Sequence, residues 1–260
     1  MIKAVLFDLD DTLLWDEKSV KMAFELTCKV ASDKFGINPD TFERKVRENA
    51  RRLYATYEVY PFTQMIGINP FEGLWGEFDD EREEFRQLKE IAPAYREQAW
   101  TLGLQDVGID NPEFGLELSE FFRTARKESP FLYDDSLSVL ELLKGEYKLL
   151  LITNGSPSLQ NLKLGITPEL APYFDEIIIS GDFGRGKPDQ TIFEHALATL
   201  SVDKSEAIMV GDNVNTDILG ANRAGIPSVW LNRHGREKGE VKPTYEISSL
   251  TELLSILENK

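Results

Sequence analysis

The stretch that decides the fold is AVLFDLDDTLLW, residues 4–15. The run IKAVLF at positions 2–7 is apolar, with β-branched and aromatic residues, which is typical of a buried strand in a parallel sheet. Three acids, Asp8, Asp10 and Asp11, follow within four positions. Like charges at this spacing repel, and burying a carboxylate is costly, so acids at the end of a core strand point to a chemical role.

Four more runs of the same kind occur in the second half of the chain. They are YKLLLI (147–152), EIIIS (176–180), EAIMV (206–210) and PSVWL (227–231). Helix-sized segments lie between the later runs, with start and stop signals such as Ser156-Pro157 and Gly225. This alternation predicts an α/β fold with a Rossmann-like, doubly wound parallel sheet.

Residues 17–129 show no convincing strand and read as amphipathic helices. The aromatic and glycine-rich segment 60–80 is predicted to be a long loop, either packed down by its aromatic rings or in contact with substrate. We therefore predict an all-helical cap domain at 17–129, inserted into a catalytic core made of residues 1–16 and 130–260. Insertions of this kind follow strand ends, so the cap is expected to cover the ligand crevice as a lid.

The composition excludes several classes of partner. The chain has 45 acidic and 29 basic residues and a net charge of -16, which disfavours binding to nucleic acid. No apolar run approaches the roughly 20 residues that span a bilayer, and acids interrupt the first apolar run too early for a secretion signal. The single cysteine, Cys28, has no disulfide partner and is expected to be a packing residue. A cytoplasmic protein with no membrane partner is predicted.

Polar residues follow four of the five predicted strands. The carboxyl ends of parallel strands meet at one edge of the sheet, so these side chains are expected to converge there. The residues are Asp8 and Asp10 after the first strand, Thr153 and Asn154 after the second, Lys187 after the third and Asp212 after the fourth.

At four motifs the chain resembles the haloacid dehalogenase superfamily, specifically its phosphatases with a helical cap between the first and second motifs. The motifs are DLDDT (8–12), TNG (153–155), KPD (187–189) and GDNVNTD (211–217). The resemblance extends over the whole chain and implies a Rossmann-like core with an inserted cap.

The resemblance implies that Asp8 attacks phosphorus and forms an aspartyl-phosphate. It also implies that Asp8, Asp212 and the backbone carbonyl of Asp10 hold Mg²⁺, whose charge offsets the repulsion between carboxylate and phosphate. Asp10 lies near other negative charge, so we expect its pKa to be raised and its side chain to act as general acid and then as general base.

The remaining motif residues receive supporting roles. Thr153 and Asn154 are expected to bind phosphate oxygens, and Lys187 to neutralise both the phosphate and Asp8. Asp217 is expected to orient the metal ligands or to cap the following helix rather than to bind the metal itself. His195 and His234 are expected to have no catalytic role.

These roles predict a Mg²⁺-dependent phosphomonoesterase for a small phosphorylated metabolite. The stretch AYREQAWTLG (94–103) resembles the cap of relatives that cleave nucleotides and sugar phosphates, and the basic run at 44–52 is either a solvated face or a contact for an anionic substrate. A phosphomutase keeps every motif and stays an alternative. A haloacid dehalogenase needs neither the acid at Asp10 nor Mg²⁺, and a phospho-accepting receiver module would lack the inserted domain. A catalytically silent binding protein is a further alternative.

Overall fold

The computed structural model describes residues 1–237 and 239–258. Lys238, in the predicted loop after the fifth strand, and residues 259–260, at the end of the predicted core, lie outside the described residues. The chain divides into two compact units. We name residues 1–15 and 132–260 the core unit and residues 16–131 the helical unit; their roles as catalytic core and cap stay a prediction.

A six-stranded parallel sheet lies at the centre of the core unit, with strand order β3-β2-β1-β4-β5-β6. The chain adds strands on one side of β1 and then on the other, which is the doubly wound arrangement. The predicted fold class is confirmed. The strands are β1 (Ala4–Phe7), β2 (Lys148–Thr153), β3 (Glu176–Ile179), β4 (Ala207–Gly211), β5 (Ser228–Leu231) and β6 (Tyr245–Ile247).

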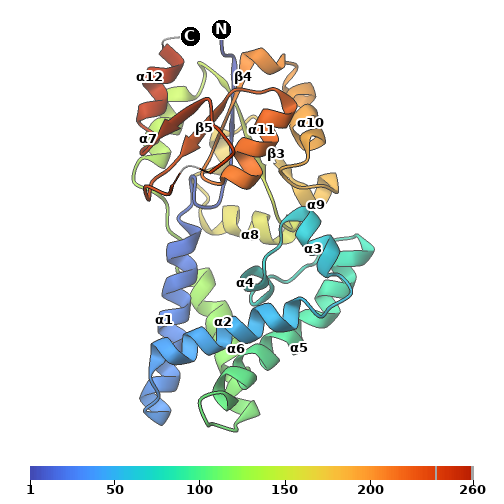
Figure 1. Ribbon diagram of the computed structural model, residues 1–260, viewed down its shortest axis with the longest axis vertical. Coiled ribbons are helices and arrows are strands. Elements are labelled where there is room, and N and C mark those ends of the chain that lie inside the picture. The colour runs from blue at the N-terminus through green and yellow to red at the C-terminus, as the bar shows by residue number, and fades with distance from the viewer. Residues whose placement is uncertain (238, 259–260) are drawn as a thin grey trace. The chain divides into compact units, whose positions relative to one another are not determined.

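Helices cover both faces of this sheet (Figure 1). They are α7 (Ser136–Leu143), α8 (Pro157–Ile166), α9 (Ser180–Phe183), α10 (Gln190–Leu200), α11 (Leu219–Ala224) and α12 (Glu252–Glu258), with helical turns η1 (Ala171–Tyr173), η2 (Lys204–Glu206) and η3 (Val214–Ile218). Val5 and Phe7 of β1 pack with apolar residues of α7, α8 and α12, while Ala4 and Leu6 pack with residues of α10 and α11. Both faces of β1 are buried, and this explains its continuous apolar sequence.

The register of β1 sets the position of the polar residues that follow the strands. Phe7 pairs with Leu151 of β2 and with Val210 of β4. The next residue, Asp8, donates its backbone N–H to the Val210 carbonyl at 3.0 Å. Because all three strands run in the same direction, Asp8 and the residues after β2 and β4 emerge at one edge of the sheet.

All elements assigned in the helical unit are helices. The helix α2 packs on α5, α5 on α6, and α1 on both α2 and α6. Phe24, Trp100 and Phe122 meet at the centre, with ring centroids 4.7–5.7 Å apart. The helices are α1 (Asp16–Phe35), α2 (Pro39–Tyr54), α3 (Tyr60–Ile66), α4 (Pro70–Gly73), α5 (Glu83–Gln105) and α6 (Pro112–Glu128).

The prediction of a loop over residues 60–80 was wrong in part, because α3 and α4 lie there. These helices span 7 and 4 residues, too short to show a helical period. A capping box at Asn69 starts α4 and satisfies its first backbone N–H groups. Phe62, Trp75 and Phe78 are buried within the unit, as expected for a segment packed down by its aromatic rings.

The sixth strand was missed by the sequence interpretation. It contains only three residues, and its side chains range from buried at Ile247 to exposed at Glu246. Within residues 1–237 and 239–258 it is an edge strand that pairs only with β5. An edge position does not demand the continuous apolar run on which the other strands were recognised.

Replacing Leu150 by alanine is expected to lower the free energy of unfolding by about 2–5 kcal/mol, because it removes a fully buried side chain from the centre of the sheet. Leu142→Ala is the matched control, since Leu142 is 61% exposed and its loss is expected to change stability by less than about 0.5 kcal/mol. Urea denaturation of both variants measures the difference. Equal effects at the two positions would contradict the packing described for β2.

Candidate active site

Three carboxylates gather at the carboxyl edge of the sheet. Asp8 follows β1, Asp212 follows β4, and Asp217 lies in the turn η3. Each offers one carboxylate oxygen, and these three oxygens lie within 4.8 Å of one another. Asp8 and Asp217 are buried and Asp212 is half-buried. The structure therefore brings together Asp8 and Asp212, as the sequence led us to expect, and adds Asp217 to the same cluster.

The donor atoms of this cluster fit a small divalent cation. Mg²⁺ prefers hard oxygen ligands and is usually held by a few carboxylates together with water or phosphate oxygens. Lys187 contacts Asp8 and Asp217, and Arg236 Nη1 lies 3.3 Å from Asp212 Oδ2. When all of these groups are ionised, the negative charges exceed the positive charges by one, which favours the binding of a cation.

Lys187 is buried among acceptors. Its Nζ lies 2.6 Å from Asp8 Oδ1, 2.7 Å from Asp217 Oδ1 and 2.8 Å from the carbonyl oxygen of Ile152. These three acceptors match the three N–H donors of an ammonium group. The side chain is 1% exposed, so this full set of partners is what makes burial of the charge tolerable.

Burial and nearby charges shift the pKa values of the residues at this site. Burial raises the pKa of Asp8 to about 6, with Asp217 adding to the effect and Lys187 opposing it. Burial also raises the pKa of Asp212 to about 8, and the neighbouring carboxylates of Asp217 and Asp8 add to this. Burial lowers the pKa of Lys187, but Asp217 and Asp8 outweigh it and raise the value above its ordinary range. A cation bound here would need these carboxylates deprotonated and would lower their pKa values.

Thr12 and Trp230 hold the acids in place. The Thr12 hydroxyl donates to Asp8 Oδ2 at 3.2 Å and accepts from the Asp212 backbone N–H at 3.1 Å. The indole N–H of Trp230 donates to the Asp212 carbonyl at 2.8 Å. The hydroxyl of Thr12 thus links the loops after β1 and β4, a role that the sequence reasoning missed because it assigned no task to this residue of the DLDDT motif.

Asp10 lies in an environment that differs from the expected one. We expected other negative charge near this side chain, whereas Lys163 Nζ lies 2.8 Å from Asp10 Oδ2 and Gln160 Nε2 lies 3.1 Å from the same oxygen. The expectation did not include these partners from the helix α8, and the raised pKa of Asp10 stays a prediction.

The two predicted phosphate ligands of the TNG motif already have protein partners. Thr153 Oγ1 accepts from Gln160 Nε2 at 2.6 Å. The Asn154 amide donates to the Lys187 carbonyl at 2.9 Å and accepts from the Lys187 backbone N–H at 2.8 Å. Asn154 therefore ties the loop that carries Lys187 to the end of β2, and its role as a direct phosphate ligand stays a prediction.

A signal in the sequence could have revealed Gln160 and Lys163. They lie one turn apart on α8, and a helical wheel places both between Leu159 and Leu164, which are buried. Two long polar residues on the apolar face of a helix need polar partners in the interior. The sequence could not say which partners these are.

The single cysteine and the two histidines, for which no catalytic role is expected, lie in three different environments. Cys28 is buried in α1, and burial raises the pKa of its thiol well above the usual range, which suits a packing role. His195 on α10 stacks on Phe183 with ring centroids 5.1 Å apart. His234 is exposed in the loop after β5.

The basic run on α2 is paired largely within its own helix. Arg44 lies 3.0 Å from Glu48, and Arg47 lies 2.7 Å from Glu43. Arg47 also lies over the ring of Phe24, 3.9 Å from its centroid. These contacts show that the basic side chains have acidic and aromatic neighbours within the helical unit. Contact of this run with an anionic substrate stays a prediction.

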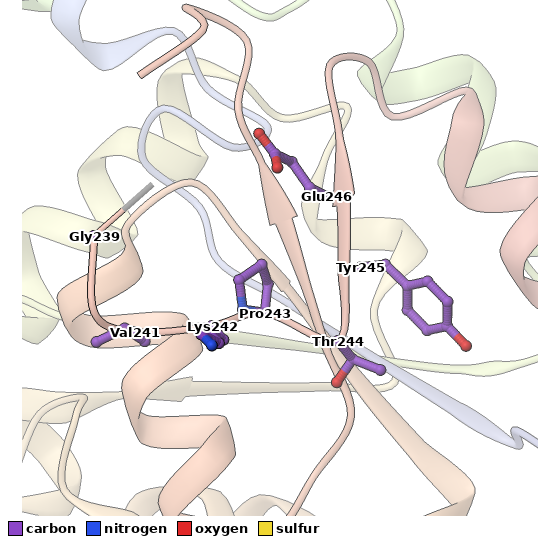
Figure 2. Close-up of a pocket in the computed structure, with 7 residues that line it drawn as sticks. All are labelled: Gly239, Val241, Lys242, Pro243, Thr244, Tyr245 and Glu246. Carbon is purple, nitrogen blue, oxygen red and sulfur yellow. The ribbon is translucent and has the colours of Figure 1, made fainter. Parts of the chain in front are cut away.

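A pocket of about 310 Å³ lies at the segment that enters β6 (Figure 2). It is lined by Gly239, Val241, Lys242, Pro243, Thr244, Tyr245 and Glu246. None of the carboxylates of the cluster is among these lining residues. No helix within residues 1–237 and 239–258 has the length and apolar character needed to cross a membrane.

Comparison with known proteins places the chain in a family. The model for haloacid dehalogenase-like hydrolases matches residues 2–225. The chain is 34% identical over 253 residues to a phosphoserine phosphatase of Thermus thermophilus, covering 97% of this chain and 98% of the relative. It is 40% identical over 143 residues to the pyrimidine 5'-nucleotidase YjjG of Escherichia coli, covering 54% and 63%.

A solved structure of similar fold has a different activity in its name. It is a 2-haloacid dehalogenase from Pseudomonas syringae pv. Tomato DC3000, with a TM-score of 0.61 and 26% identity, covering 100% of this chain and 99% of that one. The family model matches most of the chain, and the Thermus relative matches it nearly end to end. The chain is therefore an enzyme of the haloacid dehalogenase-like hydrolase family.

Proposed function

We propose that the protein is a metal-dependent phosphomonoesterase that acts through an aspartyl-phosphate on Asp8. The observation that carries this proposal is the gathering of Asp8, Asp212 and Asp217 at the carboxyl edge of the sheet, with Lys187 in contact with two of them. Such a site can hold a nucleophilic carboxylate next to positive charge, which a phosphate dianion requires. The relatives named as a phosphatase and a nucleotidase support the same chemistry.

In the first half-reaction, a carboxylate oxygen of Asp8 attacks phosphorus while the bond between phosphorus and the leaving oxygen breaks. Asp10 donates a proton to that leaving oxygen, so the alcohol departs neutral. Lys187 offsets negative charge on Asp8 and on the phosphoryl group. The products are the alcohol and the phosphorylated side chain of Asp8.

In the second half-reaction, Asp10 accepts a proton from a water molecule as that water attacks phosphorus. The bond between phosphorus and Asp8 breaks, which releases inorganic phosphate and restores the free carboxylate. Thr153 and the loop after β2 are proposed to bind the phosphoryl oxygens in both steps. The same residue serves as acid and then as base, so no further proton carrier is required.

Mg²⁺ is the proposed cofactor, held by the carboxylates of Asp8 and Asp212 and by the backbone carbonyl of Asp10. Asp217 lies in the same cluster, and we propose that it is a further ligand or a residue that orients the others. The ion supplies charge neutralisation for the attack on phosphate. Its preference for oxygen ligands agrees with the three carboxylates present.

A dehalogenase is the first alternative, because a protein of that name has a similar fold. Such an enzyme needs neither a proton donor at the position of Asp10 nor a metal ligand at Asp212. Both residues stand at the site in this chain, and this favours phosphate chemistry. A phosphomutase shares every site residue, so substrate turnover must distinguish it.

The substrate is proposed to be a small phosphorylated metabolite in the cytoplasm, in the range of nucleotides and sugar phosphates. The relatives carry names for different substrates, phosphoserine in one and pyrimidine nucleotides in the other. The net charge of -16 disfavours a nucleic acid polymer. Residues 17–129 are proposed to form the cap that selects the substrate.

The proposed function is tested with p-nitrophenyl phosphate and a panel of phosphorylated metabolites, each assayed with Mg²⁺ and with EDTA. Chelation is expected to reduce phosphate release by at least about 100-fold, because the metal contributes several kcal/mol of charge stabilisation. Adding excess Mg²⁺ back should restore the rate. Turnover that is unchanged by chelation would contradict the proposal, and isomerisation of a sugar phosphate without phosphate release would favour the phosphomutase.

A further inference from the structure

Two side chains of the helix α8 hold the carboxylate of Asp10. Lys163 Nζ and Gln160 Nε2 both contact the same oxygen, Asp10 Oδ2, at 2.8 and 3.1 Å. Two donors on one oxygen, one of them charged, restrict the orientation of a carboxylate more than a single neutral donor does. Both donors are buried, with Gln160 0% and Lys163 2% exposed.

Gln160 also connects Asp10 to the end of β2. Its Nε2 lies 2.6 Å from Thr153 Oγ1 and 2.7 Å from the carbonyl oxygen of Asn154. One amide group therefore contacts the acid and the two residues of the predicted phosphate loop. A shift of Gln160 would move the acid relative to the position where the phosphoryl group is expected.

The helix that carries these donors is well anchored. Ser156 caps it by accepting a hydrogen bond from the Leu159 backbone N–H, and Pro157 occupies its first turn. Leu159 and Leu164 are buried on either side of the polar pair. Side chains fixed on a packed helix are placed more accurately than side chains on a loop.

We propose that Lys163 and Gln160 are positioning residues that hold the Asp10 carboxylate in the place from which it transfers protons. This inference rests on the proposed function, since it assigns a task within the same reaction. Neither residue belongs to the four motifs at the strand ends, and neither touches the reacting phosphoryl group in this account. They act through Asp10.

A purely structural role for Lys163 has a different consequence. A buried ammonium needs a counter-ion, and Asp10 would serve as one even without any part in catalysis. Loss of a structural ion pair would lower activity on all substrates by the same factor. Loss of acid positioning would lower activity most where the leaving group most needs a proton.

The test compares phenyl phosphate with p-nitrophenyl phosphate, two substrates of similar size. Nitrophenolate is the more stable anion, so its departure depends less on a general acid. For Lys163→Met, kcat/KM on phenyl phosphate is expected to fall about tenfold or more beyond its fall on p-nitrophenyl phosphate. The ratio kcat/KM reports the first half-reaction, in which the leaving group departs.

Matched variants complete the design. Lys163→Arg keeps a cation near Asp10 and is expected to bring the ratio of the two substrates back towards that of the wild type. Lys148→Met removes a lysine of the same unit that bonds to the Leu200 carbonyl, and it should leave the ratio unchanged. If circular dichroism shows that Lys163→Met is unfolded, Gln160→Met carries the same comparison.

The outcomes separate the two proposals. An equal fall on both substrates, or no fall, in folded Lys163→Met or Gln160→Met would overturn the positioning role and leave the proposed function intact. Failure of the wild-type protein to hydrolyse aryl phosphates or any phosphorylated metabolite in the presence of Mg²⁺ would overturn the proposed function itself.

Discussion

Replacing Asp8 by asparagine is expected to reduce turnover of phosphate monoesters by about 10⁴-fold or more, since the proposed covalent route has no other nucleophile. Asparagine has nearly the same shape but lacks the carboxylate that would attack phosphorus. The variant also loses the negative charge of one of the three carboxylates at the proposed metal site. Steady-state phosphate release on the best substrate of the panel measures the loss.

The fold of Asp8→Asn should be preserved, because the buried Lys187 keeps two partners. Its ammonium still lies 2.7 Å from Asp217 and 2.8 Å from the Ile152 carbonyl. Asp11→Asn is the matched control, since Asp11 lies in the same loop with φ of 60°, a conformation that asparagine tolerates well. Substantial steady activity in Asp8→Asn, at a level close to that of Asp11→Asn, would refute the nucleophile.

Replacing Asp10 by asparagine is expected to slow turnover by about 10²- to 10⁴-fold, the usual contribution of a general acid or base. Both half-reactions should be affected, because the same carboxylate gives a proton to the leaving oxygen and later takes one from water. Rapid-quench measurement of alcohol release and of phosphate release follows the two steps separately.

The expected pattern distinguishes Asp10 from Asp8. Asp10→Asn should still form the phosphorylated enzyme slowly, with p-nitrophenyl phosphate less affected than phenyl phosphate. Its contacts with Lys163 and Gln160 involve Oδ2, and asparagine can keep one oxygen as an acceptor there. A variant that turns over at the wild-type rate would remove Asp10 from proton transfer.

Much of the core could be predicted from the sequence, because the strands of a parallel sheet that is buried on both faces are continuous apolar runs. The runs at 2–7, 147–152 and 206–210 are continuous and apolar, and each forms a central strand. The position of a polar residue directly after such a run fixes the edge of the sheet at which it emerges. This reasoning was sufficient to bring Asp8 and Asp212 together.

The surroundings of Asp10 could not be predicted by the same reasoning. They depend on how the helix α8 packs against the loop after β1, across about 150 residues of sequence. A helical period shows that Gln160 and Lys163 lie on the apolar face, but it does not show which side chain of another segment faces them. For Asp217 the sequence left open whether it orients the metal ligands or caps a helix, and the turn η3 brings its carboxylate into the cluster with Asp8.

The helical unit shows the limits of periodicity in another way. The four longer helices follow the apolar spacing of their sequences, whereas α3 and α4 depend on local signals such as the Asn69 capping box. Side chains that select a substrate show no periodic pattern in the sequence, because ligand binding and not core packing determines their positions. The substrate must therefore be identified by assaying the panel of phosphorylated metabolites.

The central claim is that Asp8 becomes phosphorylated during turnover, and trapping the phosphorylated enzyme tests it most directly. The protein is mixed with p-nitrophenyl phosphate and Mg²⁺, quenched in acid within the first turnover, reduced with borohydride and digested for mass spectrometry. We predict that position 8 is converted to homoserine, the reduction product of an aspartyl-phosphate, and that Asp8→Asn gives no such product. Modification at another residue, or rapid hydrolysis with position 8 unmodified at every quench time, would contradict the account.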